Sequence, residues 1–174
     1  VAKNVAAYKI LYETIKAYDP SILVISTAVE PNENYFKCGY YKYLDVYNFH
    51  TYASYHGIRN AIASYRGLMK KYDAEKPLFS TELGLNCQGM TRHAVAIELI
   101  KKFAVFFAAG GKNGSWFTIQ YPDPAGREGN SPSQAFCVFD CRYNQYNPKL
   151  DAVTLYHVVN QIGNKTFRQE MAYK

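Results

Sequence analysis

The sequence predicts an α/β fold that corresponds to half of an eightfold (β/α)8 barrel. Segments with helical spacing of apolar residues alternate with short β-branched runs along the chain, which implies a parallel sheet with right-handed crossovers. The 174 residues can bury one domain core but are too few for a complete barrel, which needs about 250. Four parallel strands alone would leave two exposed edges, so half a barrel fits better than a complete open sheet.

The first half of the chain predicts one helix and two strands. Residues 4–18 carry apolar or aromatic side chains three and four positions apart, as one helix face does: Val5, Tyr8, Leu11, Ile15 and Tyr18. The run Ile22–Ile25 is too short for a buried helix and is typical of a strand covered on both sides. Residues 30–43 predict an irregular loop or a short helix, and Asp45–His50 predicts a second strand.

The second half continues this alternation. A second helix has on its apolar face Ile58, Ile62, Tyr65, Met69 and Tyr72, and it leads into the strand Leu78–Thr81. Thr91 can cap a third helix, whose apolar face holds Val95, Leu99, Phe103 and Phe106 and which Gly110-Gly111 would end. A fourth strand, Ser115–Gln120, precedes a loop rich in proline and glycine. The last helix begins near Pro148 and ends at Gly163, with Leu150, Val153, Val158 and Ile162 as its apolar positions.

Charge and composition exclude several function classes. The formal net charge of +6 comes from 20 scattered Lys and Arg, so we expect no nucleic-acid partner. No apolar run is long enough for a membrane span, and the N-terminus has no signal-peptide pattern. The four cysteines, Cys38, Cys87, Cys137 and Cys141, lack paired CxxC spacing and a histidine cluster, so we expect no metal and no other cofactor. The 16% aromatic residues suit either a sugar-binding cleft or a core.

Polar residues gather where the predicted strands end. In a barrel, one rim would carry Ser26 or Thr27, His50 with Tyr52, Glu82, and Gln120 with Tyr121. Glu82 is the leading catalytic candidate, although a glutamate here can also be a solvated loop or capping residue. His50 and Tyr52 are two residues apart and point to the same side, where both can approach Glu82. A tyrosine hydroxyl bonded to a carboxylate stabilises its ionised form and fixes which oxygen is free to attack. The alternative is that His50 and Tyr52 simply end a strand with satisfied side chains.

Several segments, in order, resemble the retaining glycoside hydrolases built on a (β/α)8 barrel and grouped as clan A. Tyr18-Asp19-Pro20 with Ile22–Ile25 resembles the fifth strand of that family, and residues 45–52, with a His-x-Tyr ending, resemble the sixth. Residues 76–84 resemble the seventh strand, in which the family's nucleophile matches Glu82. Residues 114–123 resemble the eighth strand, and 136–140 with 147–149 resemble the closing loop and last helix. The resemblance implies that residues 1–174 are a single domain, the C-terminal half of the barrel with about strands 5 to 8.

The sequence departs from the family pattern at two places. The family's acid/base is a glutamate, usually in an Asn-Glu pair, after the fourth strand, and that position would lie upstream of Val1. Glu30-Pro31 is a poor substitute because Val29 stands where asparagine is expected. The family often places tryptophan at the end of the eighth strand, whereas this strand ends at Ile119-Gln120-Tyr121, so we expect Trp116 to be buried and Tyr121 to take part of its role.

The resemblance implies retaining hydrolysis of β-glycosidic bonds in an oligo- or polysaccharide, with Glu82 as nucleophile. The substrate-binding residues that it implies are His50, Tyr52, Trp116, Gln120 and Tyr121. We expect an upstream half-barrel of the same protein as partner, which leaves localisation open and makes secretion or export to a periplasm possible. One alternative is a non-catalytic carbohydrate-binding or scaffold protein that stacks sugars on Tyr52, Tyr55 and Tyr121. Another is a half-barrel that pairs with an identical copy.

Overall fold

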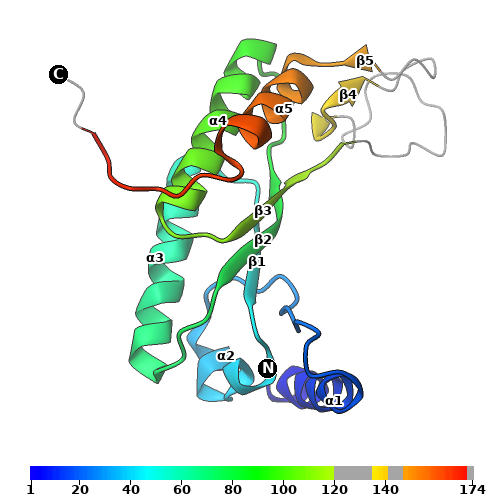
Figure 1. Ribbon diagram of the computed structural model, residues 1–174, viewed down its shortest axis with the longest axis vertical. Coiled ribbons are helices and arrows are strands. Elements are labelled where there is room, and N and C mark those ends of the chain that lie inside the picture. The colour runs from blue at the N-terminus through cyan, green and yellow to red at the C-terminus, as the bar shows by residue number, and fades with distance from the viewer. Residues whose placement is uncertain (120–134, 141–146, 172–174) are drawn as a thin grey trace.

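The computed structural model describes residues 1–119, 135–140 and 147–171 (Figure 1). Its central feature is a parallel sheet in the order β1-β2-β3, formed by Tyr47–Thr51, Leu78–Gly84 and Asn113–Phe117. Two short antiparallel strands, β4 and β5, pair Phe139–Asp140 with Asn147–Pro148. The sequence did not predict this small second sheet, whose two-residue strands carry no periodic signal.

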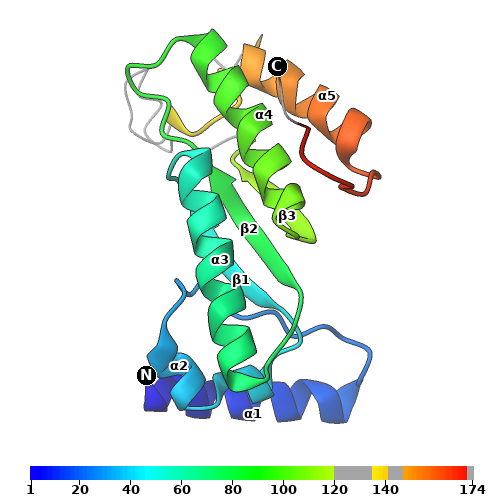
Figure 2. The ribbon, with the colours of Figure 1, turned by 90° about the vertical axis from the view of Figure 1, so that its left-hand side faces the viewer.

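Helices cover one side of the parallel sheet (Figure 2). The connection from β1 to β2 contains α3 (Tyr55–Tyr72), and that from β2 to β3 contains α4 (Arg92–Ala108). The last helix, α5 (Leu150–Ile162), packs against α4, as α4 does against α3. The predicted cap of α4 is confirmed, because the Thr91 side chain accepts a hydrogen bond from Ala94 N at 3.2 Å. No helix among these described residues is both long and apolar enough to cross a bilayer.

The N-terminal part lies near the start of β1, at the bottom of Figure 1. It contains α1 (Ala2–Tyr18), α2 (Glu33–Lys37) and a 3-10 helix, η1 (Tyr40–Tyr43). The predicted loop or short helix at 30–43 is therefore confirmed. Asn32 begins α2 by accepting a hydrogen bond from Asn34 N at 2.9 Å, as expected for an N-cap asparagine.

The predicted buried strand Ile22–Ile25 is wrong. Only Ile25 forms a bridge, parallel to Val46, and Leu23 is 60% exposed. The ladder is interrupted because side chains replace backbone acceptors. Val24 N donates to the Asp45 carboxylate at 2.7 Å, and Asn48 N donates to the Ser26 hydroxyl at 2.8 Å. The segment therefore runs beside β1 without forming a regular strand. The last predicted strand also differs, since β3 begins two residues before Ser115 and ends at Phe117.

The core is aromatic and lies between the sheet and the helices. Tyr47 and Phe49 of β1 are fully buried against Tyr65 of α3, with ring centroids 5.6 and 5.9 Å from it. Phe36 lies 5.5 Å from Tyr47 and connects α2 to the same cluster. Contiguous rings of this kind bury a large apolar area, which fixes β1 to α3 and positions the end of the strand.

Two predicted apolar helix faces are only partly buried. In α1, Val5 and Tyr8 are buried but Leu11 is 52% exposed. In α5, Val158 is buried while Val153 is 46% exposed. These faces belong to the first and last helices, at opposite ends of the fold (Figure 1). The helical periodicity was predicted correctly, but burial depends on what packs against each face.

Candidate active site

An irregularity in β2 orients Glu82. Asn48 pairs with Phe79 and His50 with Glu82, so two steps along β1 match three along β2. The β2–β3 pairing shows the same extra residue between Ser80 and Leu83. With strict alternation, Glu82 would share the helix-facing side with Ser80, which is buried and bonds Phe49 O. The bulge instead leaves Leu83 in the core and turns Glu82 to the opposite face of the sheet.

Tyr52 and His50 both contact one oxygen of Glu82. The Tyr52 hydroxyl donates a hydrogen bond to Glu82 Oε2, and His50 Nδ1 lies 3.3 Å from the same atom. The side chains of His50 and Glu82 are 30% and 29% exposed, so the pair is open to solvent on one side. Among the described residues, both of these contacts are made to Oε2 and neither is made to Oε1.

A chain of polar side chains orients His50. Asn48 accepts a hydrogen bond from Thr81 N at 3.0 Å and donates from Nδ2 to Thr81 Oγ1 at 2.9 Å. Thr81 Oγ1 lies 2.8 Å from His50 Nε2. In the tautomer with the proton on Nδ1, Thr81 donates to His50 Nε2 and His50 Nδ1 donates to Glu82 Oε2. The polar chain therefore runs from Asn48 through Thr81 and His50 to Glu82, whose carboxylate is the final acceptor.

Aromatic rings hold Tyr52 in place. Its ring meets Phe117 and Phe136 edge to face, with centroids 5.9 and 5.3 Å away. It lies so close to Gly84 that a Cβ on that residue would be 2.4 Å from Tyr52 Cε1. Burial, and then the hydrogen bond to Glu82, raise the pKa of the Tyr52 hydroxyl above its ordinary value. Tyr52 therefore remains a protonated donor at neutral pH.

Trp116 lies on the opposite face of the sheet from Tyr52 and Glu82. Its ring packs against Phe103 of α4 at 5.9 Å and against the small cluster of Leu85, Cys87 and Val95. The neighbouring Phe117 is the β3 residue whose ring meets Tyr52. The structure thus brings His50, Tyr52 and Glu82 together but not Trp116. Gln120 and Tyr121 lie outside the described residues, so the roles predicted for them stay predictions.

Four residues around the site were not predicted from the sequence. Asn48 and Thr81 are part of the polar chain, and Phe117 fixes Tyr52. Lys102 of α4 is fully buried, and its ammonium donates to Gly84 O and lies 5.9 Å from the centre of the Trp116 ring. The signal for Lys102 was available, because it lies three positions after Leu99 on the apolar face of the predicted helix.

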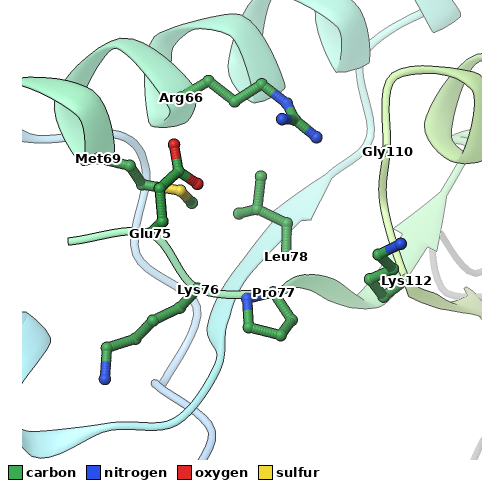
Figure 3. A pocket seen from close by; sticks show the side chains of 8 residues that line it. All are labelled: Arg66, Met69, Glu75, Lys76, Pro77, Leu78, Gly110 and Lys112. Atoms are coloured by element: carbon green, nitrogen blue, oxygen red, sulfur yellow. The ribbon is translucent and has the colours of Figure 1, made fainter. Parts of the chain in front are cut away.

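A cavity of about 430 Å³ lies at the opposite end of β2 (Figure 3). It is lined where the strand begins by Lys76, Pro77 and Leu78, and around them by Arg66, Met69, Glu75, Gly110 and Lys112. The Lys76 ammonium points away from it and donates to Leu44 O at 2.5 Å. The one carboxylate that lines the cavity, Glu75, precedes β2, whereas Glu82 lies near the other end of that strand. The cavity is therefore separate from the site formed by His50, Tyr52 and Glu82.

Comparison with solved structures finds three partial matches. A family 39 glycoside hydrolase from the gut symbiont Bacteroides cellulosilyticus matches 95% of this chain with a TM-score of 0.72 and 17% identity, over 39% of its own chain. A protein from Neocallimastix frontalis matches 64% of this chain, with a TM-score of 0.52 and 18% identity, over 29% of its own. An endo-β-1,4-mannanase from Thermotoga petrophila matches 94% of this chain with a TM-score of 0.49 and 15% identity, over 41% of its own.

The match to the family 39 glycoside hydrolase establishes the fold. The predicted α/β architecture with a parallel sheet, part of a (β/α)8 barrel, is confirmed by its match to part of a glycoside hydrolase. The chain spans less than half the length of each of these three structures. No protein-family model and no curated protein matches the chain. The class that the fold defines is therefore part of a (β/α)8 barrel, the fold that this chain shares with a family 39 glycoside hydrolase.

Proposed function

We propose that this chain contributes the nucleophile, Glu82, to a retaining glycoside hydrolase that cleaves β-glycosidic bonds in an oligo- or polysaccharide. The observation that carries the proposal is the contact of Tyr52 and His50 with one oxygen of Glu82, at the carboxyl end of β2. Barrel enzymes assemble their active sites at this end of the strands. The fold shared with a family 39 glycoside hydrolase agrees with this chemistry.

The geometry suits nucleophilic attack. Hydrogen bonds to Oε2 hold the plane of the carboxylate, while Oε1 attacks the anomeric carbon and displaces the leaving sugar oxygen. The product of this step is a covalent glycosyl-enzyme, which water then hydrolyses with net retention. The polar chain through Thr81 keeps His50 oriented toward the carboxylate throughout.

A second carboxyl group is needed to protonate the leaving oxygen and later to activate water. In retaining enzymes it lies about 5 to 5.5 Å from the nucleophile. We expect it from an upstream half-barrel of the same protein. The exposed apolar side chains of α1 and α5 support such a partner, because they lie on helices at opposite ends of this fold. Glu30, which the sequence offers as a poor substitute for this acid, is exposed in the structure. The residue before it, Val29, donates its N–H to Asn48 O of β1 at 3.2 Å.

The test is Glu82→Gln in the full-length protein, assayed on a panel of aryl β-glycosides that includes glucoside, xyloside, mannoside and galactoside. We expect turnover to fall by roughly a thousandfold or more, because the amide cannot form the covalent intermediate. Glu13→Gln, a change of an exposed α1 carboxylate, is the matched control and should leave turnover unchanged. Azide added to Glu82→Ala should restore cleavage and give a glycosyl azide of inverted configuration. Near-wild-type turnover by Glu82→Gln would eliminate the proposal, and saccharide binding without turnover by the wild type would favour a carbohydrate-binding protein.

A further inference from the structure

Lys102 is an unusual residue for the position that it occupies. Its side chain is fully buried in α4, among the apolar residues Leu99, Phe103 and Phe106. Among the described residues, no carboxylate lies within ion-pair distance of its ammonium, which instead donates to the backbone carbonyl of Gly84. Desolvating an ammonium costs several kcal/mol, which is more than one hydrogen bond to a neutral acceptor returns. A methionine would fill the same space without this cost, so stability alone does not account for a lysine here.

The bond from Lys102 acts close to the candidate nucleophile. Gly84 follows Glu82 by two residues and ends β2. Its Cα lies against the Tyr52 ring, since a Cβ there would clash with that ring, while its carbonyl is held from the helix side. A shift of the Gly84 peptide would therefore move both Glu82 and the surface on which Tyr52 rests.

Glu98, one helical turn before Lys102, makes a corresponding contact beyond the end of β1, at the start of α3. Its Oε1 accepts a hydrogen bond from Tyr55 N at 2.8 Å. Tyr55 is three residues after Tyr52 and is the first residue of α3. The carboxylate thus satisfies a backbone donor at a helix N-terminus, where the helix dipole favours negative charge.

We propose that Lys102 and Glu98 are positioning residues, which hold the Gly84 carbonyl and the Tyr55 amide from one turn of α4 and so fix the Tyr52 hydroxyl against Glu82. Both contacts are made to backbone groups, so one turn of α4 fixes the positions of the end of β2 and the start of α3. The catalytic consequence rests on the proposed function, whereas the effect on the Tyr52–Glu82 contact does not.

The local charges are consistent with this role. The groups that act on the Lys102 ammonium are Glu98 on its own helix and the buried Cys87 thiol after β2, and the Trp116 ring of β3 lies beside it. Burial lowers the pKa of Lys102 to about 8, which reflects the missing ion-pair partner. Lys102 is therefore held by a carbonyl and an aromatic ring, both of which depend on where the strands end.

The experiment uses the full-length protein labelled with 13Cζ-tyrosine, in which loss of one signal in Tyr52→Phe assigns Tyr52. In Lys102→Met and in Glu98→Ala, we expect the Tyr52 signal to move toward that of a solvated tyrosine, and kcat to fall roughly 10- to 100-fold with KM nearly unchanged. Glu98→Gln keeps the acceptor and should resemble the wild type. Lys70→Met, a change of an exposed lysine on α3, is the control and should change neither quantity.

Each outcome decides the proposal. A wild-type Tyr52 signal in both folded Lys102→Met and folded Glu98→Ala overturns it. If Lys102→Met does not fold, Glu98→Ala alone decides. If the wild type hydrolyses no glycoside of the panel, the proposed function fails, but the Tyr52 signal still tests whether α4 positions the pair. A lower melting temperature with an unmoved Tyr52 signal would mean that the two side chains only stabilise the fold, which also overturns the proposal.

Discussion

At the scale of single residues, the Tyr52 hydroxyl can be removed without disturbing its surroundings. Tyr52→Phe keeps the ring contacts with Phe117 and Phe136 and removes only the donor to Glu82. A hydrogen bond to a charged group contributes about 1.5 to 3 kcal/mol, so kcat/KM should fall about 10- to 100-fold. Because the pKa of Tyr52 is raised, the ratio of wild type to variant should stay constant between about pH 5 and 9. Tyr43→Phe, in η1 near the start of β1, serves as control, and a ratio near one for Tyr52→Phe would contradict the role of its hydroxyl.

The buried ammonium of Lys102 predicts how stability depends on pH. Its pKa is about 8 in the folded chain and near its ordinary 10.5 when unfolded, so the unfolded chain binds more protons between these values. The free energy of unfolding of the wild type, relative to Lys102→Met, should therefore rise from pH 8 to 10.5, by about 3 kcal/mol at most. Urea titrations of both proteins across this range measure the difference. A flat difference would mean that the ammonium is well solvated.

The sequence was enough to predict which residues belong to the site, but not which residues contact one another. Glu82, His50 and Tyr52 could be grouped because strand ends and two-residue spacing are visible in the sequence. Trp116 and Phe117 could not be told apart, because a shift of one residue exchanges the two faces of a strand. Lys102 was overlooked although its spacing is helical, since a charged residue is normally expected on the solvent side.

At the scale of elements, the end of β2 depends on a glycine. Gly84→Ala would place a Cβ 2.4 Å from the Tyr52 ring and 3.0 Å from Phe117 O, so the ring must move. We expect a loss of about 1 to 3 kcal/mol in unfolding free energy, together with reduced turnover. Gly67→Ala, at an exposed position of α3 with nothing within 4 Å of the new Cβ, is the matched change and should stabilise by about 0.5 to 1 kcal/mol. Thermal unfolding of both variants measures whether each change raises or lowers the free energy of unfolding. Equal changes in the two variants would contradict the close approach of Tyr52 to Gly84.

Helices were easier to predict than strands for a physical reason. A helix forms its own hydrogen bonds, so the apolar spacing in α3 and α4 was sufficient. A strand depends on a partner, and Ile22–Ile25 failed as a strand because Asp45 and Ser26 side chains took over ladder bonds. The bulge in β2, which orients Glu82, has no signature in the residues Ser80-Thr81-Glu82. Pairing is thus decided by neighbours that lie far apart in the sequence.

At the scale of the whole molecule, the two end helices present apolar surface. Ile10 and Leu11 of α1 are 68% and 52% exposed, and Tyr156 and Val159 of α5 are 67% and 57% exposed. If an upstream half-barrel normally covers these faces, the 174-residue chain produced alone should self-associate. Sedimentation velocity should show a mass that rises with concentration, and Leu11→Lys combined with Val159→Lys should reduce the association, since a charge at each face opposes burial. A single closed dimer would instead favour pairing of two identical half-barrels, because an isologous interface saturates at two copies. A monomer at every concentration would contradict both, since it would show that these apolar faces are stable in water.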